Sequence, residues 1–388
     1  MRKRNTIIFV LLPGLLLFLF AEITLRLGGF SFYPADLAFR IDEQYRVFTE
    51  GADKGFYVTS PRKTGIFIEQ RFAVKKPVEN YRIFILGGST INYLGGFERL
   101  KKQLEARYAG KTVEIINCGG LSYGTTRLLL VFQEVLGYDP DLVILYSGHN
   151  EFEEECLKTP GGDKGFLGRL NESMLNIRLY QLFSRVFYEV KKARPLFSPA
   201  TNVVWGRSFD EKQKTGIYKT YQNNVEQMVR LAKNKGIAMI VCAVAYNRLG
   251  RPPFYSSLYG TYDAFVKAID PDKIKAAVGT DTNDPMLEFE IGKLCYAEGD
   301  FEKAKSHLER AYVLDAQPHR ANRITNNIAK QIAKKYHIPL VDIDGRMAAE
   351  SRGGIPEQRF FSDHCHLSEL GKEILQDEMY NVIKAELR

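Results

Sequence analysis

The sequence has few cysteines, and no pairing pattern connects them. The five cysteines in its 388 residues are widely separated, and no two of them form a Cys-x-x-Cys pair. They stand at Cys118, Cys156, Cys242, Cys295 and Cys365. Five scattered cysteines encode neither a disulfide framework nor a zinc ribbon. We therefore expect most of them to be small residues of a hydrophobic core.

A concentrated basic stripe is missing as well. The formal net charge is +8, but the basic residues are spread along the chain. This distribution argues against a nucleic-acid partner, which calls for clustered positive charge. Hydrophobic residues make up 45% and charged residues 26%, which is usual for a folded protein and excludes low-complexity classes. A chain of this length can form one elaborated core with inserts.

Only one long hydrophobic run is present, near the N-terminus. Three basic residues at positions 2–4 precede an uncharged run over 7–21, and Glu22 and Arg26 follow it. About 20 largely apolar residues match the thickness of a bilayer core at roughly 1.5 Å per residue. We expect 1–28 to be a transmembrane anchor, with a cleaved signal peptide as the alternative. Both place the basic tip in the cytoplasm and the remaining chain outside it, in the periplasm or at the cell surface.

The chain changes its pattern at residue 81. Residues 29–80 show no sustained period and are interpreted as a lead-in segment, whereas 81–388 alternate apolar runs with amphipathic segments. Such alternation is typical of βαβ units and predicts an α/β domain with a parallel sheet. The expected strands are 82–86, 113–116, 142–146, 237–244 and 340–343, and the expected helices are 97–108, 125–136, 218–235, 324–337 and 367–387.

Two inserts interrupt this alternation. The first, 153–214, carries an apolar stripe at Ile177, Tyr180, Phe183, Phe187 and Val190 with basic residues between them. It predicts an amphipathic helix beside the site, which can be a lid, a membrane-surface helix or a packing helix.

The second insert, 285–321, has small and aromatic residues at spacings that resemble one tetratricopeptide repeat. The residues are Gly292, Tyr296, Gly299, Ala304, Ala311 and Pro318. A single copy cannot form the solenoid that gives such repeats independent stability, so it packs on the main domain or on a protein partner. A plain helical hairpin is the alternative.

Ser89 is the first candidate for chemistry. It follows the strand expected at 82–86 and the tight turn that Gly87 and Gly88 permit. The carboxyl edge of an open parallel sheet is where ligands bind, so a hydroxyl there is well placed as a nucleophile. A helix N-cap is the competing interpretation, because serine is common at that position.

Three further stretches supply partners for Ser89. The turn at 117–125 contains three glycines, whose backbone N–H groups can donate to an oxyanion, and Asn150 follows the third strand with a side-chain amide. Asn150 can equally be a turn residue or a cap. Asp363 and His366 share one face if they lie on a helical turn, so the carboxylate can orient the imidazole. Residues 363–366 also allow a metal site, although four adjacent residues seldom close one tetrahedral site.

Together these stretches resemble the SGNH/GDSL hydrolase family. The matching blocks are 87–90, 119–124, 148–150 and the Asp363-x-x-His366 pair. The resemblance implies a flavodoxin-like three-layer α/β/α sandwich with a five-stranded parallel sheet and no cofactor or metal. It implies that Ser89 attacks, that His366 is the general base and that Asp363 orients it. It also implies an oxyanion hole from the Ser89 N–H, the turn at Gly120 and Ser122, and Asn150.

Two departures from the family pattern stand out. Gly88 replaces the Asp of the family's Gly-Asp-Ser signature, a position that is not itself catalytic, so little is expected to be lost. Ser122 stands where the family's oxyanion glycine aligns, which leaves open which backbone N–H of the turn points inward.

The resemblance extends to bacterial membrane-anchored proteins with a tetratricopeptide-like insert. It implies an extracytoplasmic serine esterase or deacylase that acts on an ester-linked acyl group of a cell-envelope glycan or lipid. An O-acyltransferase that moves an acetyl group to an exopolysaccharide is the alternative on the same residues. A non-catalytic envelope assembly protein, whose hairpin binds a protein partner, is the third hypothesis.

Overall fold

The computed structural model describes residues 2–28, 46–108, 110–158, 174, 177–180, 182–183 and 207–386. These residues belong to two compact units. One contains Met1–Tyr45 and Cys156–Val204, and the other contains Arg46–Glu155 and Trp205–Arg388. Each unit is described by itself.

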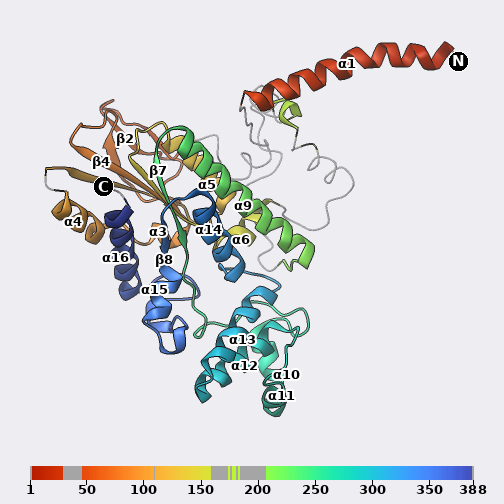
Figure 1. The fold of residues 1–388 in the computed structure, drawn as a ribbon, viewed down its shortest axis with the longest axis vertical. Coiled ribbons are helices and arrows are strands. Elements are labelled where there is room, and N and C mark those ends of the chain that lie inside the picture. Colours follow the sequence, from red (N-terminus) through yellow and green to blue (C-terminus); the bar gives the residue numbers. More distant parts are fainter. Residues whose placement is uncertain are drawn as a thin grey trace. The chain divides into compact units, whose positions relative to one another are not determined.

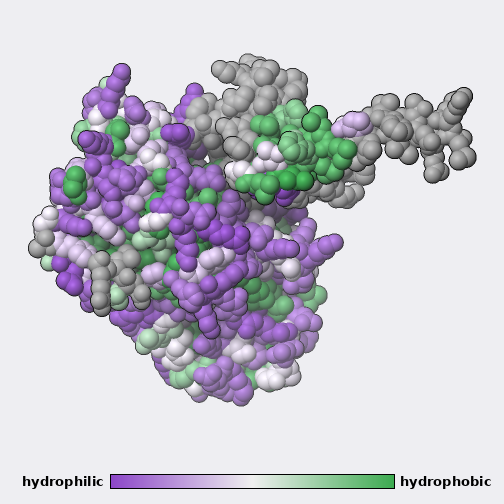
Figure 2. Space-filling model, turned by 45° about the horizontal axis from the view of Figure 1, so that its top comes forward, coloured by the Kyte–Doolittle hydropathy of each residue, from purple (hydrophilic) through white to green (hydrophobic). Residues whose placement is uncertain are grey.

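In the first unit, the N-terminal segment forms helix α1 (Arg2–Leu27). Glu22 pairs with Arg26 at 2.7 Å and accepts hydrogen bonds from the backbone N–H groups of Arg178 and Leu179 at 3.0 and 2.9 Å. Apolar side chains of α1 form a hydrophobic surface (Figure 2), with exposed residues Leu16, Leu17, Phe18, Leu19, Phe20, Ile23 and Leu27. Within the described residues, no helix combines the length and the apolarity that crossing a membrane requires. The expected transmembrane anchor is therefore not confirmed.

The insert at 153–214 lies mostly outside the described residues. Of the expected amphipathic segment, the structure describes 177–180 and 182–183, while Phe187 and Val190 lie outside the description. Helix α6 (Glu151–Lys158) covers the start of the insert. Helix α9 (Glu211–Asn234) begins at Glu211, before the expected end of the insert at residue 214. The lid, membrane-surface and packing interpretations stay predictions.

The second unit is built on a five-stranded parallel sheet, as predicted. Its order is β5-β4-β6-β7-β8, with β4 at Asn80–Gly87, β5 at Thr112–Gly119, β6 at Leu142–Tyr146, β7 at Ala238–Ala243 and β8 at Leu340–Asp342. Numbered along the chain, this order is 2-1-3-4-5, which is the flavodoxin-like arrangement. Gly87 pairs in register with Gly119 and with Tyr146. The turns that follow these three strands therefore meet at one edge of the sheet.

Helices cover both faces of this sheet (Figure 1). On one face, α4 (Glu98–Arg107) packs on α16 (Glu369–Glu386), with α15 (Ile343–Ala349) beside α16. On the other, α5 (Thr125–Val135) and α14 (Arg323–Tyr336) pack on α9. The predicted three layers are thus present, because each central strand is apolar on both faces and has to be covered twice.

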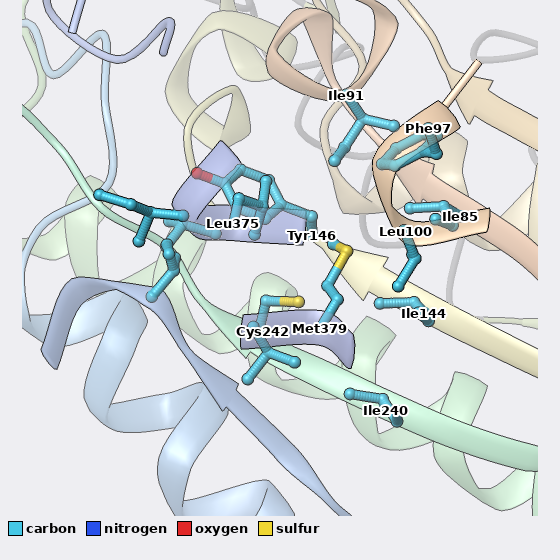
Figure 3. Packing of buried hydrophobic residues seen from close by; sticks show 14 of the residues in the cluster. Ile85, Ile91, Phe97, Leu100, Ile144, Tyr146, Ile240, Cys242, Leu375 and Met379 are labelled. Atoms are coloured by element: carbon cyan, nitrogen blue, oxygen red, sulfur yellow. The ribbon is translucent and has the colours of Figure 1, made fainter. Parts of the chain in front are cut away.

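The core beneath α4 and α16 shows how the sheet is held (Figure 3). Ile85, Ile144 and Ile240 from three neighbouring strands are fully buried there, together with Leu100 and Met379 from the two helices. Burying one such side chain contributes about 1.5–3 kcal/mol relative to exposure. This packing fixes the strands, and hence the edge that carries Ser89.

The lead-in segment contains a small sheet that the sequence does not predict. Strands β1 (Phe48–Glu50), β2 (Phe56–Thr59) and β3 (Arg71–Ala73) pair antiparallel. Three or four residues are too few to show a clear alternation. Gln70 joins this part to the main sheet, because its amide exchanges two hydrogen bonds with the backbone of Asn117.

The segment between β7 and β8 is helical. Helices α10 (Tyr262–Ala268) and α11 (Pro271–Ala276) precede an antiparallel pair, α12 (Pro285–Glu298) and α13 (Phe301–Leu314), which occupies the expected hairpin at 285–321. The pair has its own apolar core, in which Gly292 lies directly under Leu308. The resemblance to a tetratricopeptide repeat stays a prediction, as does a protein partner on this surface.

Candidate active site

The turn after β4 places Ser89 at the carboxyl edge of the sheet. Gly87 ends the strand, Gly88 is the N-cap, and Ser89 begins the short helix α3 (Ser89–Asn92). Gly88 makes no side-chain capping bond, and a Cβ atom at this position would overlap Nδ2 of Asn150. A side chain at position 88 would therefore require the end of the Asn150 side chain to shift. The expectation that little is lost by having glycine there stays a prediction.

Asp363 and His366 lie in a closed loop rather than in the helical turn that their spacing suggests. A bridge between Phe361 and Leu367 closes the loop. Asp363 Oδ1 accepts hydrogen bonds from the backbone N–H groups of Cys365 and His366 at 2.9 and 2.8 Å. These local side-chain bonds stabilise a turn in place of helix. The loop follows the 3-10 turns Arg352–Gly354 and Gln358–Phe360 and precedes helix α16.

Ser89, His366 and Asp363 form a continuous hydrogen-bonded set. His366 Nδ1 lies 2.5 Å from Asp363 Oδ2, and His366 Nε2 lies 2.7 Å from Ser89 Oγ. Ser89 and His366 are both half-buried. This geometry puts a base within hydrogen-bonding distance of the hydroxyl and a carboxylate behind the base. The competing N-cap interpretation of Ser89 is wrong, because Gly88 is the N-cap residue.

Asp363 is held in its charged form. Burial disfavours ionisation, but the hydrogen bonds from the His366 ring and from the two backbone N–H groups outweigh it and lower the pKa of the carboxyl below its usual value. A charged carboxylate at 2.5 Å holds the proton on His366 Nδ1 and leaves Nε2 to accept the hydroxyl proton of Ser89.

In the turn 119–124, the Gly120 N–H already has an acceptor, whereas the N–H groups of Ser122 and Gly124 have none among the described residues. The Gly120 N–H donates to the Gly87 carbonyl at 2.9 Å, and the Tyr123 N–H donates to the Gly120 carbonyl at 3.2 Å. Ser122 has a left-handed backbone with φ 61°, and its N–H has no acceptor among the described residues. The expectation that Gly120 serves as an oxyanion donor is therefore wrong, whereas Ser122 keeps an unused N–H.

Asn150 reaches the same place from the end of β6. It is buried, and its Nδ2 donates one hydrogen to the Tyr123 carbonyl at 3.2 Å. The second N–H of the amide is left for another acceptor. The side chain therefore both fastens the second-block turn and carries a donor beside Ser89.

Acidic residues directly after Asn150 hold the turn, and the sequence interpretation missed them. Ser122 Oγ donates to Glu153 Oε1 at 2.7 Å, and the Arg127 guanidinium donates to the Ser122 carbonyl. Arg127 in turn pairs with buried Glu154 at 2.8 Å. Burial raises the pKa of Glu153. The run of acidic residues at 151–155, so close to Asn150, is the signal that could have identified them.

His364 does not take the role of the base. Its Nδ1 lies 3.5 Å from Asp363 Oδ1, and its ring contacts Phe254 at a centroid distance of 5.5 Å. Burial and the nearby charge of Arg320 lower the pKa of His364 to about 4. The ring is therefore neutral at neutral pH.

The alternative of a metal at 363–366 fits poorly. Asp363, His364 and Cys365 bring possible ligand atoms within 4.8 Å of one another. However, burial raises the pKa of the Cys365 thiol, which disfavours the thiolate that a metal needs. The Asp363 carboxylate already accepts three hydrogen bonds. The Asp363 carboxylate is thus already occupied by hydrogen bonds within the loop and to the His366 ring.

Comparison with known proteins gives structural neighbours at low similarity. No family model matches the sequence, and no curated protein matches it. A GDSL-like lipase from Bacteroides thetaiotaomicron is similar with a TM-score of 0.38 and 14% identity, over 81% of this chain and 93% of the lipase. The acetylxylan esterase Axe2 from Geobacillus stearothermophilus is similar with a TM-score of 0.38 and 12% identity, over 78% of this chain and 94% of the esterase. These values are too low to transfer residues or chemistry to this chain.

Proposed function

We propose that this protein is a serine ester hydrolase with Ser89 as nucleophile, His366 as general base and Asp363 as the carboxylate that orients the base. The observation that carries the proposal is the pair of hydrogen bonds on the His366 ring, 2.7 Å to Ser89 Oγ and 2.5 Å to Asp363 Oδ2. A hydroxyl, an imidazole and a carboxylate in this order are the arrangement that activates a serine.

The reaction begins when Ser89 Oγ attacks the acyl carbonyl while its proton moves to His366 Nε2. The carbonyl π electrons move onto oxygen, and this oxyanion accepts hydrogen bonds from the Ser122 N–H and the free Asn150 N–H. Collapse of the intermediate breaks the bond to the alcohol, which leaves with the proton from His366. Water then attacks the acyl-enzyme with His366 again as base, and the acid and free Ser89 are released. Donors fixed in advance stabilise the oxyanion without rearrangement.

The substrate in this proposal is an ester-linked acyl group of an envelope glycan or lipid. Water as the second nucleophile makes the protein an esterase, whereas a sugar hydroxyl in its place would make it an O-acyltransferase. The location outside the cytoplasm stays a prediction, which an alkaline phosphatase fusion after the C-terminus tests, because the phosphatase is active only if it is exported.

Labelling with a fluorophosphonate probe tests the proposed nucleophile directly. We expect the probe to modify Ser89 in the full-length protein, as shown by peptide mass spectrometry, and we expect no labelling of Ser89→Ala. The wild type should hydrolyse vinyl acetate, and neither Ser89→Ala nor His366→Ala should do so. Labelling at another serine, or activity retained in Ser89→Ala, would refute the assignment.

A further inference from the structure

Aromatic rings form an uninterrupted series of contacts through the His366 ring. Tyr93 lies 4.9 Å from His366, His366 lies 5.9 Å from His364, and His364 lies 5.5 Å from Phe254, all between ring centroids. Phe254 continues the series to His319 at 4.2 Å. We call these five rings the ring row.

The ring row is accessible from solvent at its apolar members. Tyr93 is 53% exposed and Phe254 is 39% exposed, while His364 and His319 are half-buried. Exposed aromatic rings beside a candidate nucleophile are typical of sites in which a ligand packs against the faces of the rings. Burial, followed by the charge of Arg320, lowers the pKa of His319 to about 4, as it does for His364. Each of these neutral imidazoles offers one donor and one acceptor.

Phe254 is held in place although its ring is exposed. Its backbone N–H donates to Asp315 Oδ2 at 2.7 Å, and the next N–H, of Tyr255, donates to Oδ1 at 3.1 Å. Arg320 donates to the Pro252 carbonyl at 2.9 Å and lies over the Phe254 ring at 5.6 Å. A ring fixed in advance loses little entropy when a ligand packs on it. The segment after α13 thus supports one wall of the site.

We propose that the ring row binds the sugar ring of an acylated pyranoside, and that its ester reaches Ser89 from this side. This inference rests on the proposed function. A pyranose ring has an apolar C–H face and a rim of hydroxyl groups, which matches exposed aromatic faces interleaved with neutral imidazoles. An acyl chain would match apolar rings alone.

Binding without catalysis is the first test. In Ser89→Ala protein, saturation-transfer NMR with methyl β-xylopyranoside carrying one acetyl ester should detect binding. Phe254→Leu keeps an apolar side chain but removes the aromatic face, and we expect it to raise the Kd by roughly 3- to 10-fold, the range of one aromatic contact. Leu258→Ala is the matched control, because Leu258 is 74% exposed, lies four residues after Phe254 in the loop that follows β7, and is outside the ring row. An unchanged Kd in Phe254→Leu, or no binding at all, would overturn the inference.

Kinetics with the Ser89 enzyme is the second test. Phe254→Leu should lower kcat/KM for the acetylated pyranoside by the same 3- to 10-fold through KM, a larger loss than for vinyl acetate, which has no ring. Leu258→Ala should leave kcat/KM for both esters unchanged. An equal loss for both esters would assign Phe254 to structure, and a loss confined to vinyl octanoate would assign the ring row to an acyl chain. Absence of any hydrolysis together with absence of fluorophosphonate labelling would refute the proposed function, while the binding test still decides the inference.

Discussion

Two groups of residues lie beside Ser89, and they are held by contacts of different separation along the sequence. We call the loop with Asp363 and His366 the triad wall, and the segment with Phe254 the ring wall. On the triad side, Asp363 and His366 are three residues apart and share one closed loop. On the ring side, Phe254 is fastened by Asp315, which lies 61 residues further along the chain. The first wall therefore depends on local backbone turns that the triad residues themselves create. The second depends on side chains that reach from the helical segment to the backbone of a loop.

This difference implies different consequences of mutation. A change on the triad side alters the groups that react and should appear in kcat. A change on the ring side alters the support of a binding surface and should appear in KM or in stability. The predictions that follow test whether the two walls can be separated in this way.

The largest effect is expected from Asp363→Asn. The amide cannot stabilise a positive charge on His366 and can bind the wrong tautomer, so kcat for vinyl acetate should fall by up to about 10⁴-fold. Ser362→Ala is the matched control in the same loop, because the exposed Ser362 hydroxyl makes a single hydrogen bond within the described residues, to the His366 carbonyl at 3.3 Å. Steady-state kinetics with vinyl acetate measures kcat of the two variants. A decrease of less than about tenfold in Asp363→Asn would show that the loop, and not the charge, orients the base.

A smaller effect on the same wall is expected from Gly88→Ala. The new methyl group would displace the Asn150 amide, and loss of one oxyanion donor typically lowers kcat by about 10²- to 10³-fold. Asn150→Ala should give a similar decrease, and the double variant should fall little further, because both changes remove one donor. Gly216→Ala, on α9 with open space around the position, is the control. Additive losses in the double variant would contradict a shared cause.

The triad wall was largely predictable from the sequence, and the ring wall was not. Glycines after an apolar strand indicated Ser89, and the Asp-x-x-His spacing indicated Asp363 and His366, because such signals depend on neighbouring residues. The unused N–H could not be assigned to Ser122 over Gly120, because it depends on which carbonyl each N–H meets in the fold. Likewise, no local pattern links Phe254 to Asp315.

The five strands and the main helices were predictable from apolar periodicity, because this signal too depends only on neighbouring residues. Each buried strand is short and apolar. Helix α9, expected at 218–235, buries an apolar stripe at Tyr218, Tyr221, Val225, Met228 and Ala232. The strands of the small sheet β1–β3 escaped prediction, since their stability comes from pairing and from ring contacts such as Phe48 on Phe72 at 5.0 Å. Such contacts leave no period in the sequence.

On the ring side, Asp315→Asn should act on stability before chemistry. The buried carboxylate accepts the backbone N–H groups of Phe254, Tyr255 and Gln317 through both of its oxygens. Asparagine keeps one accepting oxygen, but its NH2 group cannot accept a hydrogen bond, so at least one of these N–H groups loses its acceptor. We expect the free energy of unfolding to fall by about 1.5–3 kcal/mol, as for hydrogen bonds to a charged group. Urea unfolding measures this change. The folded fraction should keep its kcat for vinyl acetate, and an equal loss of kcat would show that the two walls are not separable.

The smallest effect is expected from the buried His149. Its Nδ1 accepts the Ala321 backbone N–H at 3.1 Å, and its ring is 5% exposed. Burial is the largest cause that lowers the pKa of His149, to about 3 from its ordinary 6.5; the positive charge of Arg320 acts in the same direction and the negative charge of Asp363 in the opposite one.

Because the pKa of His149 is lower in the folded state than in the unfolded state, the unfolded state binds more protons as the pH falls through this window. The stability contributed by neutral His149 is complete above about pH 6.5 and is lost progressively towards about pH 3. Between pH 7 and pH 5.5 the loss amounts to about 1 kcal/mol for a single group. His149→Gln keeps an acceptor for the Ala321 N–H and does not titrate. Urea unfolding at the two pH values should therefore give a difference about 1 kcal/mol smaller in the variant than in the wild type. The same difference in both proteins would mean that His149 is protonated as easily in the folded state as in the unfolded state, and would contradict the lowered pKa.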